Sequence, residues 1–108
     1  GLDNLTVMID YNKHQSYGAT TEVQDLEPLA DKWRSFGFAV REVDGHDVEA
    51  LHECLECLPF SHGRPNAVIC HTVKGKGVDF AESNMEWHHK SRVADEDIDA
   101  LLDSLERY

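Results

Sequence analysis

Short apolar stretches rich in β-branched residues alternate with amphipathic helical stretches, and this alternation limits the possible folds more than any other feature of the chain. The expected strands cover residues 5–9, 38–43 and 67–73. The first reads Leu-Thr-Val-Met-Ile, a pattern typical of a strand buried on both faces. Strands that alternate with helices at this spacing favour right-handed crossovers and a sheet covered on both sides. The sequence therefore predicts an α/β fold with a three-stranded, mainly parallel sheet flanked by helices.

Three further stretches place their apolar residues on one face of a helix. They lie in residues 25–36, 48–58 and the acidic C-terminal segment 91–108. Each has an acidic residue near its start that can cap a helix N-terminus, and these residues are Asp25, Asp47 and Asp95. In the first helix, Pro28 is expected in the first turn and Gly37 just past the end.

The length of the chain suits one small domain, since it has 108 residues of which 41% are hydrophobic. Three strands nevertheless make a thin sheet. An α/β domain that begins directly on an apolar strand lacks the neighbouring elements that would cover this strand. We therefore expect residues 1–108 to form half of a larger domain.

The charge balance restricts the partners. The chain has 21 Asp and Glu against 10 Lys and Arg, a net charge of -11. Such a surface repels phosphate backbones and anionic lipids, so nucleic acid and membranes are not expected as partners. No apolar run approaches the roughly 20 residues of a membrane span, and residues 1–15 lack the pattern of a signal peptide. The expected location is the cytoplasm.

Polar clusters follow each predicted strand, at the end of the sheet where open α/β folds bind ligands. Asp10-Tyr11-Asn12 offers oxygen ligands of the kind that Mg²⁺ prefers, although a hydrogen-bonded turn is the simpler interpretation of these residues alone. Residues 44–47 are interpreted as a turn that leads into a helix cap. Lys-Gly-Lys-Gly at residues 74–77 combines close backbone approach with two ammonium groups, which suits an anionic ligand such as phosphate.

Cys54 and Cys57 have the CxxC spacing of redox and zinc sites. They fall near the end of a predicted helix, beside Glu53 and Glu56, where the helix dipole and these charges both disfavour a thiolate. We interpret the pair as structural, and a redox protein is the less favoured hypothesis.

Residues 87–90, Trp-His-His-Lys, place two histidines beside an aromatic ring in a polar loop. A neutral imidazole can act as an acid or a base near pH 7, and partial burial against Trp87 would help to keep it uncharged. This loop is the best candidate for proton transfer, with an ordinary surface loop as the alternative.

Taken in order, six segments resemble the thiamine-diphosphate-binding domain of transketolase. They are residues 2–5, 10–12, 26–33, 43–47, 71–77 and 87–90. The resemblance runs from residue 1 to about residue 90, and split or small-subunit transketolase-like proteins are the nearest type. It implies that residues 1–108 are the C-terminal part of the diphosphate-binding domain, which is the N-terminal domain of these enzymes.

The resemblance also implies roles for four residues. Asn12 matches the asparagine that binds Mg²⁺ (or Ca²⁺) against the diphosphate, and His14 would offer its backbone carbonyl to the same metal. Lys74 matches a position that contacts the cofactor. His88 matches the histidine that faces the diphosphate and the substrate and assists proton transfer, whereas His89 takes a place that is often Gly and receives no role.

By the same resemblance, the chain is a portion of an enzyme that transfers a two-carbon ketol unit between sugar phosphates. The family's Gly-Asp-Gly metal motif would lie before residue 1, and the pyrimidine-binding domain is also missing. We therefore expect no activity from the chain alone, and a missing domain or partner subunit within a homo- or hetero-oligomer. The alternative is a non-catalytic folded remnant or a partner-binding fragment, whose exposed sheet edge pairs with another polypeptide.

Overall fold

The computed structural model describes residues 1–108, and a three-stranded parallel sheet lies at its centre. The strands are β1 (Thr6–Tyr11), β4 (Ala39–Asp44) and β5 (Asn66–His71). Their order is β1-β5-β4, so the last strand in the chain is the central one. In the register, Val7 and Val40 both pair with Ala67. The predicted three-stranded parallel sheet is confirmed, with boundaries shifted by one or two residues.

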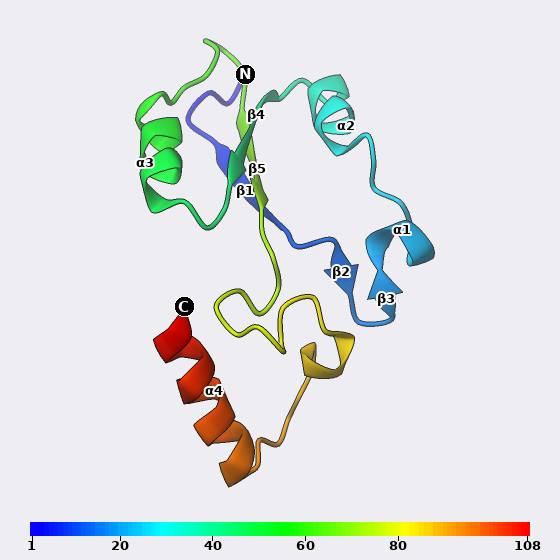
Figure 1. Ribbon diagram of the computed structural model, residues 1–108. Coiled ribbons are helices and arrows are strands. Elements are labelled where there is room, and N and C mark those ends of the chain that lie inside the picture. Colours follow the sequence, from blue (N-terminus) through cyan, green and yellow to red (C-terminus); the bar gives the residue numbers. More distant parts are fainter.

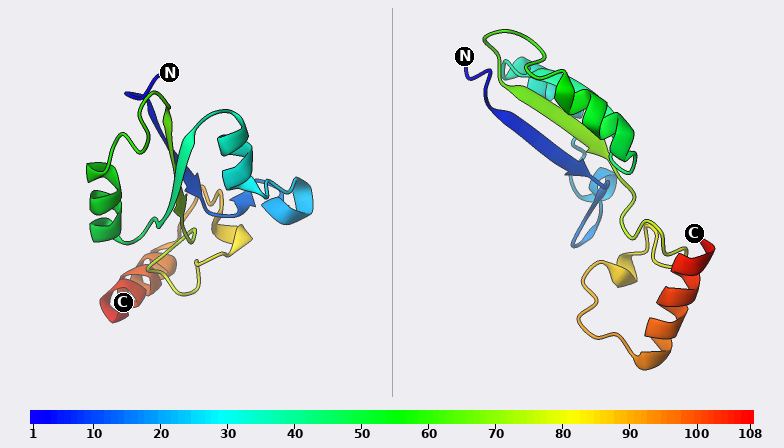
Figure 2. Two further views of the ribbon diagram at one scale, coloured as in Figure 1. Left: turned by 90° about the horizontal axis from the view of Figure 1, so that it is seen from above. Right: turned by 90° about the vertical axis from the view of Figure 1, so that its left-hand side faces the viewer.

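Two helices cover opposite faces of this sheet. The crossing from β1 to β4 carries α2 (Leu29–Ser35), and the return from β4 to β5 carries α3 (Val48–Glu56). Figures 1 and 2 show the strands between α2 and α3. The connection from β1 to β4 and the connection from β4 to β5 run across the sheet in opposite directions. Since such crossovers are right-handed, the two helices lie on opposite faces.

The start of α2 differs from the prediction. Pro28 is the N-cap, in extended conformation, and Asp25 caps no helix. The Asp25 carboxylate instead accepts a hydrogen bond from the Glu27 N–H, and Glu27 accepts one from the Leu29 N–H. Because ψ of Pro28 is 104°, outside the helical range, the helix begins at the residue that follows it.

Of the other two predicted N-caps, one is confirmed and one is wrong. Asp47 caps α3 as predicted, since its Oδ1 accepts a hydrogen bond from the Ala50 N–H at 2.9 Å. Asp95 does not cap the last helix, α4 (Asp95–Arg107), because it is the first helical residue and Ala94 is the N-cap. The carboxylate that receives the Ala94 N–H belongs to Asp97.

Short elements that the sequence did not predict follow β1 and β5. A two-stranded antiparallel hairpin joins β2 (His14–Gln15) to β3 (Gly18–Ala19), and the helical turn α1 (Thr20–Val23) follows. A 3-10 turn, η1 (Met85–Trp87), precedes α4. Elements this short contain no repeat of apolar residues that a pattern could detect.

The buried core lies on β5. All its residues from Asn66 to Cys70 are buried, because β5 has a strand on each side. The apolar pattern of β1 is typical of a strand buried on both faces, yet Met8 is 50% exposed and Leu5 just before the strand is 41% exposed. This exposure agrees with the prediction that the chain lacks neighbouring elements that would cover this strand. Since β1 lies at an edge of the sheet and α2 and α3 both contact β4, the outer part of β1 stays open.

The chain forms two lobes rather than one sphere. Its radius of gyration is 17.0 Å, whereas a compact chain of about 100 residues has about 13 Å. Residues 1–72 make the sheet lobe, and residues 73–108 make a C-terminal lobe of loop, η1 and α4 below the strand ends (Figures 1 and 2). Buried Ser104 ties α4 to the loop, because its hydroxyl bonds both the N–H and the carboxylate of Asp79. None of the helices is both long and apolar enough to cross a membrane.

Candidate functional site

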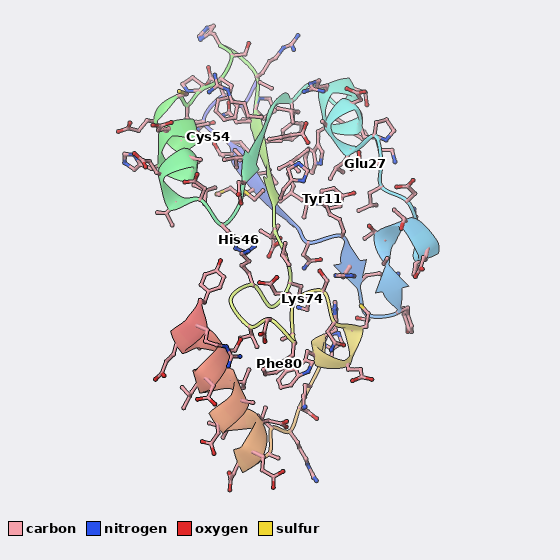
Figure 3. The ribbon with its side chains drawn as sticks, viewed as in Figure 1. Tyr11, Glu27, His46, Cys54, Lys74 and Phe80 are labelled. Atoms are coloured by element: carbon pink, nitrogen blue, oxygen red, sulfur yellow. The ribbon has the colours of Figure 1, made fainter.

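A hollow of about 390 Å³ lies where the carboxyl ends of the strands meet the C-terminal lobe. Figure 3 shows His46 and Lys74 at this junction. The hollow is lined by residues from all three strand ends: Asp10, Asn12, His46, Thr72, Val73, Lys74, Gly75 and Lys76. The predicted metal residue Asn12 and the predicted cofactor residue Lys74 therefore share one hollow, as expected at this end of a parallel sheet.

Asn12 begins a tight turn directly after β1. Its Oδ1 accepts a hydrogen bond from the His14 N–H at 3.0 Å, which leaves a second lone pair on the same oxygen. The Thr20 N–H donates to the Lys13 carbonyl just outside the His14–Ala19 pair of the hairpin. His14 and Ala19 therefore form a non-hydrogen-bonded antiparallel pair, in which the N–H and C=O groups of both residues point away from the partner strand. The carbonyl of His14 is therefore not used by the hairpin.

The loop at residues 74–77 forms internal hydrogen bonds that use part of the predicted anion site. The N–H of Lys76 donates to the Val73 carbonyl, and the N–H of Gly77 donates to Glu82. The N–H groups of Lys74 and Gly75 have no acceptor in the protein. Lys74 also has no carboxylate within ion-pair distance. An anion at this loop would meet the two free amides and the unpaired ammonium of Lys74, whereas the Lys76 ammonium lies 3.9 Å from the Glu82 carboxylate.

Residues 44–47 form the turn and cap that the sequence predicted, and they also hold the loop. The Asp44 carboxylate accepts from the His46 N–H at 2.9 Å. The His46 Nε2 accepts from the Val73 N–H at 2.8 Å, which joins the end of β4 to the chain just before Lys74. Sequence reasoning treated this cluster as a turn only. The position of residues 44–47 directly after a predicted strand was the sequence feature that could have indicated a role at the hollow.

His88 has an unusual environment. Its Nδ1 is buried and has no hydrogen-bond partner. Removal from water lowers the pKa of His88, and electrostatic repulsion, mainly from Lys74, lowers it further. Both effects favour the neutral imidazole. Of the four predicted site residues, Asn12 and Lys74 line the hollow, whereas His14 and His88 are not among its lining residues.

Around His88, the neighbouring side chains make contacts of their own. The His89 ring lies 4.6 Å from the His88 ring, and its Nε2 is 2.9 Å from the Ser16 hydroxyl on the hairpin turn. The Trp87 ring packs edge-on against Phe80, with 5.3 Å between the ring centroids. The ammonium of Lys90 lies 3.8 Å from the centroid of the Trp87 ring.

The cysteines do not form a second site. Cys54 lies in the last turns of α3 and Cys57 is its C-cap. Burial raises the pKa of the Cys54 thiol, so the thiolate is disfavoured. No three His, Cys, Asp or Glu side chains are grouped to hold a metal ion. The structure thus offers no support for a CxxC redox or zinc centre.

A parallel sheet whose polar loops converge on a hollow at the carboxyl ends of its strands defines an α/β ligand-binding domain. Within that class, the chain matches the family model "Transketolase, thiamine diphosphate binding domain" over residues 1–106. It therefore belongs to this family. The match confirms the family that the motifs indicated and extends through α4, beyond residue 90, where the resemblance of the motifs ends.

Curated relatives are named as subunits of transketolases. The 6-deoxy-6-sulfo-D-fructose transketolase subunit SqwG of Clostridium sp. (strain MSTE9) is 41% identical over 88 residues, which are 82% of this chain and 32% of the relative. A subunit of the apulose-4-phosphate transketolase of Phocaeicola vulgatus is 37% identical over 106 residues, which are 98% of this chain and 38% of the relative. The chain thus spans about a third of the length of these relatives.

Solved transketolases share the fold. A transketolase mutant from Pichia stipitis superimposes with a TM-score of 0.71 at 20% identity, over 98% of this chain and 19% of that one. The transketolase of Leishmania mexicana gives a TM-score of 0.64, also at 20% identity and over the same shares of the two chains. The predicted fold, a partial thiamine-diphosphate-binding fold, is confirmed.

Proposed function

We propose that residues 1–108 are part of a transketolase-type enzyme that transfers a two-carbon ketol unit between sugar phosphates, using thiamine diphosphate and Mg²⁺ (or Ca²⁺). The observation that supports the proposal is the convergence at one hollow of an amide oxygen on Asn12 and an unpaired ammonium on Lys74. The buried, unpartnered Nδ1 of His88 supports the same proposal. Membership of the family supports the same activity.

The residues present fit the cofactor and its metal. Asn12 Oδ1 and the His14 carbonyl are hard oxygen donors of the kind that Mg²⁺ binds, and Mg²⁺ usually completes its shell with phosphate oxygens and water. Lys74 and the free N–H groups of Lys74 and Gly75 suit the diphosphate, since they bring positive charge and donors to the same hollow. We assign Asn12 and His14 to the metal and Lys74 to the cofactor.

Thiamine diphosphate, when bound, supplies the nucleophilic carbon and the electron sink for cleavage of the carbon–carbon bond. The chain itself supplies orientation and proton handling. Desolvation and the adjacent Lys74 lower the pKa of His88 and favour its neutral form. The neutral imidazole can accept a proton from a substrate hydroxyl and, once protonated, can return that proton to the product. Lys74 would bind the negative charge of the diphosphate, and its own positive charge lowers the pKa of the His88 imidazole.

The proposed enzyme is larger than the chain. We propose that residues 1–108 are one partial domain, with 91–108 as its acidic C-terminal segment. Since the curated relatives are about three times longer and are named as subunits, the pyrimidine-binding domain or a partner subunit would complete the site, in a homo- or hetero-oligomer. The chain alone should show no ketol transfer.

The proposal is tested by separating cofactor binding from turnover in the intact protein that contains residues 1–108. Asn12→Ala should weaken Mg²⁺-dependent binding of thiamine diphosphate, measured by isothermal titration calorimetry. His88→Ala should bind the cofactor nearly as well but lower kcat by about 10²- to 10⁴-fold, as loss of an acid-base group does. Cys57→Ala, at the exposed C-cap of α3 and not among the residues that line the hollow, is the control. Wild-type binding and kinetics in both site variants would refute the assignment.

A second candidate function is supported by the open edge of β1. Met8 is 50% exposed on a strand with one free edge, and such an edge can pair with another polypeptide. The chain would then be a non-catalytic, partner-binding fragment. A monodisperse monomer with cooperative unfolding would argue against obligate pairing.

A further inference from the structure

Lys13 lies between the two groups proposed to hold the metal, the Asn12 side chain and the His14 carbonyl. Its φ is +64°, in the left-handed region that lysine rarely adopts and that favours Gly, Asn and Asp. A lysine in this conformation needs contacts that hold it there, and the structure provides them on both its side chain and its backbone.

The Lys13 ammonium is held against the ends of β1 and β5. Its Nζ donates to the Tyr11 carbonyl at 2.8 Å and lies 2.8 Å from Nδ1 of His71. The same ammonium lies 4.3 Å from the centroid of the Tyr11 ring. The Lys13 side chain therefore packs against the ends of these two strands and does not extend into solvent.

His71 is held in turn by β4. Its Nε2 is 2.8 Å from Oε1 of Glu42. An ammonium can only donate and a carboxylate can only accept, so Nδ1 is the acceptor for Lys13 and Nε2 carries the hydrogen for Glu42. We call Glu42, His71 and Lys13 the relay. It connects the ends of β4 and β5 to the turn after β1.

The backbone of Lys13 is fixed by a different residue. Its carbonyl accepts hydrogen bonds from both the N–H and the hydroxyl of Thr20, at 2.8 Å and 3.2 Å. Thr20 is buried where the hairpin enters α1. Both ends of Lys13 are thus anchored, and the residues on either side of it have little freedom to turn.

We propose that Lys13 is a positioning residue, and that the relay holds the turn that carries the two proposed metal ligands, Asn12 Oδ1 and the His14 carbonyl. No member of the relay is assigned a contact with cofactor or metal, and its effect passes through the turn. The inference rests on the proposed function, because it takes Asn12 and His14 as the metal ligands.

The first test does not depend on the cofactor. At pH 8, where an ordinary imidazole is neutral, ¹⁵N NMR of the His71 ring should show the hydrogen on Nε2 and none on Nδ1. This preference should weaken in Glu42→Gln and in Lys13→Gly. A hydrogen on Nδ1 in the wild-type protein would overturn the relay, whatever the chain's function.

The second test measures Mg²⁺-dependent affinity for thiamine diphosphate by calorimetry in the intact protein that contains residues 1–108. Lys13→Gly removes the ammonium but accepts a positive φ, and it should weaken binding by roughly 10- to 100-fold, the usual effect of losing a residue that orients a metal ligand. His71→Leu should do the same. His71→Gln should bind within about threefold of wild type, because its amide can accept from Lys13 and donate to Glu42.

Tyr11→Phe is the matched control for a purely structural role. It deletes the 2.9 Å hydrogen bond from the Tyr11 hydroxyl to Glu27 but keeps the ring and carbonyl that contact Lys13. It should lower Tm without changing metal-dependent affinity. Weak binding in Asn12→Ala with normal binding in Lys13→Gly and His71→Leu would overturn the positioning role and leave the proposed function intact. Normal binding in Asn12→Ala would overturn both.

Discussion

Gly75 lies at the point where the loop after β5 closes on itself, and it should not tolerate a side chain. Its φ is +81°, and a Cβ added there would lie 2.6 Å from the Ala81 carbonyl oxygen and 2.8 Å from the carbonyl carbon. Both are backbone atoms, in a turn held by the hydrogen bond from the Ala81 N–H to the Val78 carbonyl at 2.9 Å. They cannot move aside as the end of a flexible side chain can.

Gly75→Ala therefore has two separate costs. A left-handed conformation costs a residue with a Cβ about 1–2 kcal/mol. Forcing atoms into an occupied space adds about 1–3 kcal/mol, so the total is about 2–5 kcal/mol. Gly37→Ala is the control, because Gly37 has φ +90° and an added Cβ would meet nothing within 4 Å. It should cost only the first amount, about 1–2 kcal/mol.

The assay is urea unfolding of both variants, followed by circular dichroism, with hydrogen exchange as the local readout. The Ser83 N–H donates to the Lys74 carbonyl across this loop, so its exchange should accelerate in Gly75→Ala and stay unchanged in Gly37→Ala. If both variants lost the same free energy of unfolding within about 0.5 kcal/mol, a resolution typical for such comparisons, the contact with Ala81 would carry no energy and the reasoning would fail.

Two further predictions concern stability. Asn66 is fully buried; its Oδ1 accepts a hydrogen bond from the Phe60 N–H, and its Nδ2 donates to the carbonyls of Asp3 and Leu5. Asn66→Ala should therefore lower the free energy of unfolding in urea by about 3 kcal/mol or more, and a loss below about 1 kcal/mol would contradict this. For His88, the pKa is lowered in the folded state, so the unfolded chain binds the proton more readily and stability should fall as pH drops below about 6.5. Stability measured from pH 7 to pH 5 should decline less in His88→Ala than in wild type, and equal declines would contradict the burial argument.

The sheet was predictable because its signals are local. The apolar run of β5 and the stripe of α3 behind Asp47 are patterns in consecutive residues, and the structure confirms them. The exposure of β1 was predictable only from the position of the strand in the chain, and not from its own apolar pattern. Its residues read as a strand buried on both faces, but burial depends on which elements lie beside the strand, and β1 has a neighbour only on the β5 side.

Part of the candidate site was likewise predictable from local patterns, and part was not. Asn12, Lys74 and His88 could be selected because their chemistry and position after predicted elements suggested ligands, and the family resemblance then gave them roles. Lys13 and His71 could not be selected, because their significance lies in a hydrogen bond between residues 58 positions apart. Neither a periodicity nor a motif records such a pair, and only the topology brings it together.

The division of the chain into two lobes gives the site a further property. The sheet lobe supplies the oxygen donors proposed for the metal, whereas the C-terminal lobe supplies the imidazole proposed for proton transfer. Side-chain bonds at the junction include His46 to the Val73 N–H and Ser16 to His89, both near 2.9 Å. Because these bonds fix one lobe relative to the other, weakening them should disturb the alignment of metal and imidazole before it disturbs either lobe. The architecture therefore favours loss of turnover without loss of fold when the junction is altered.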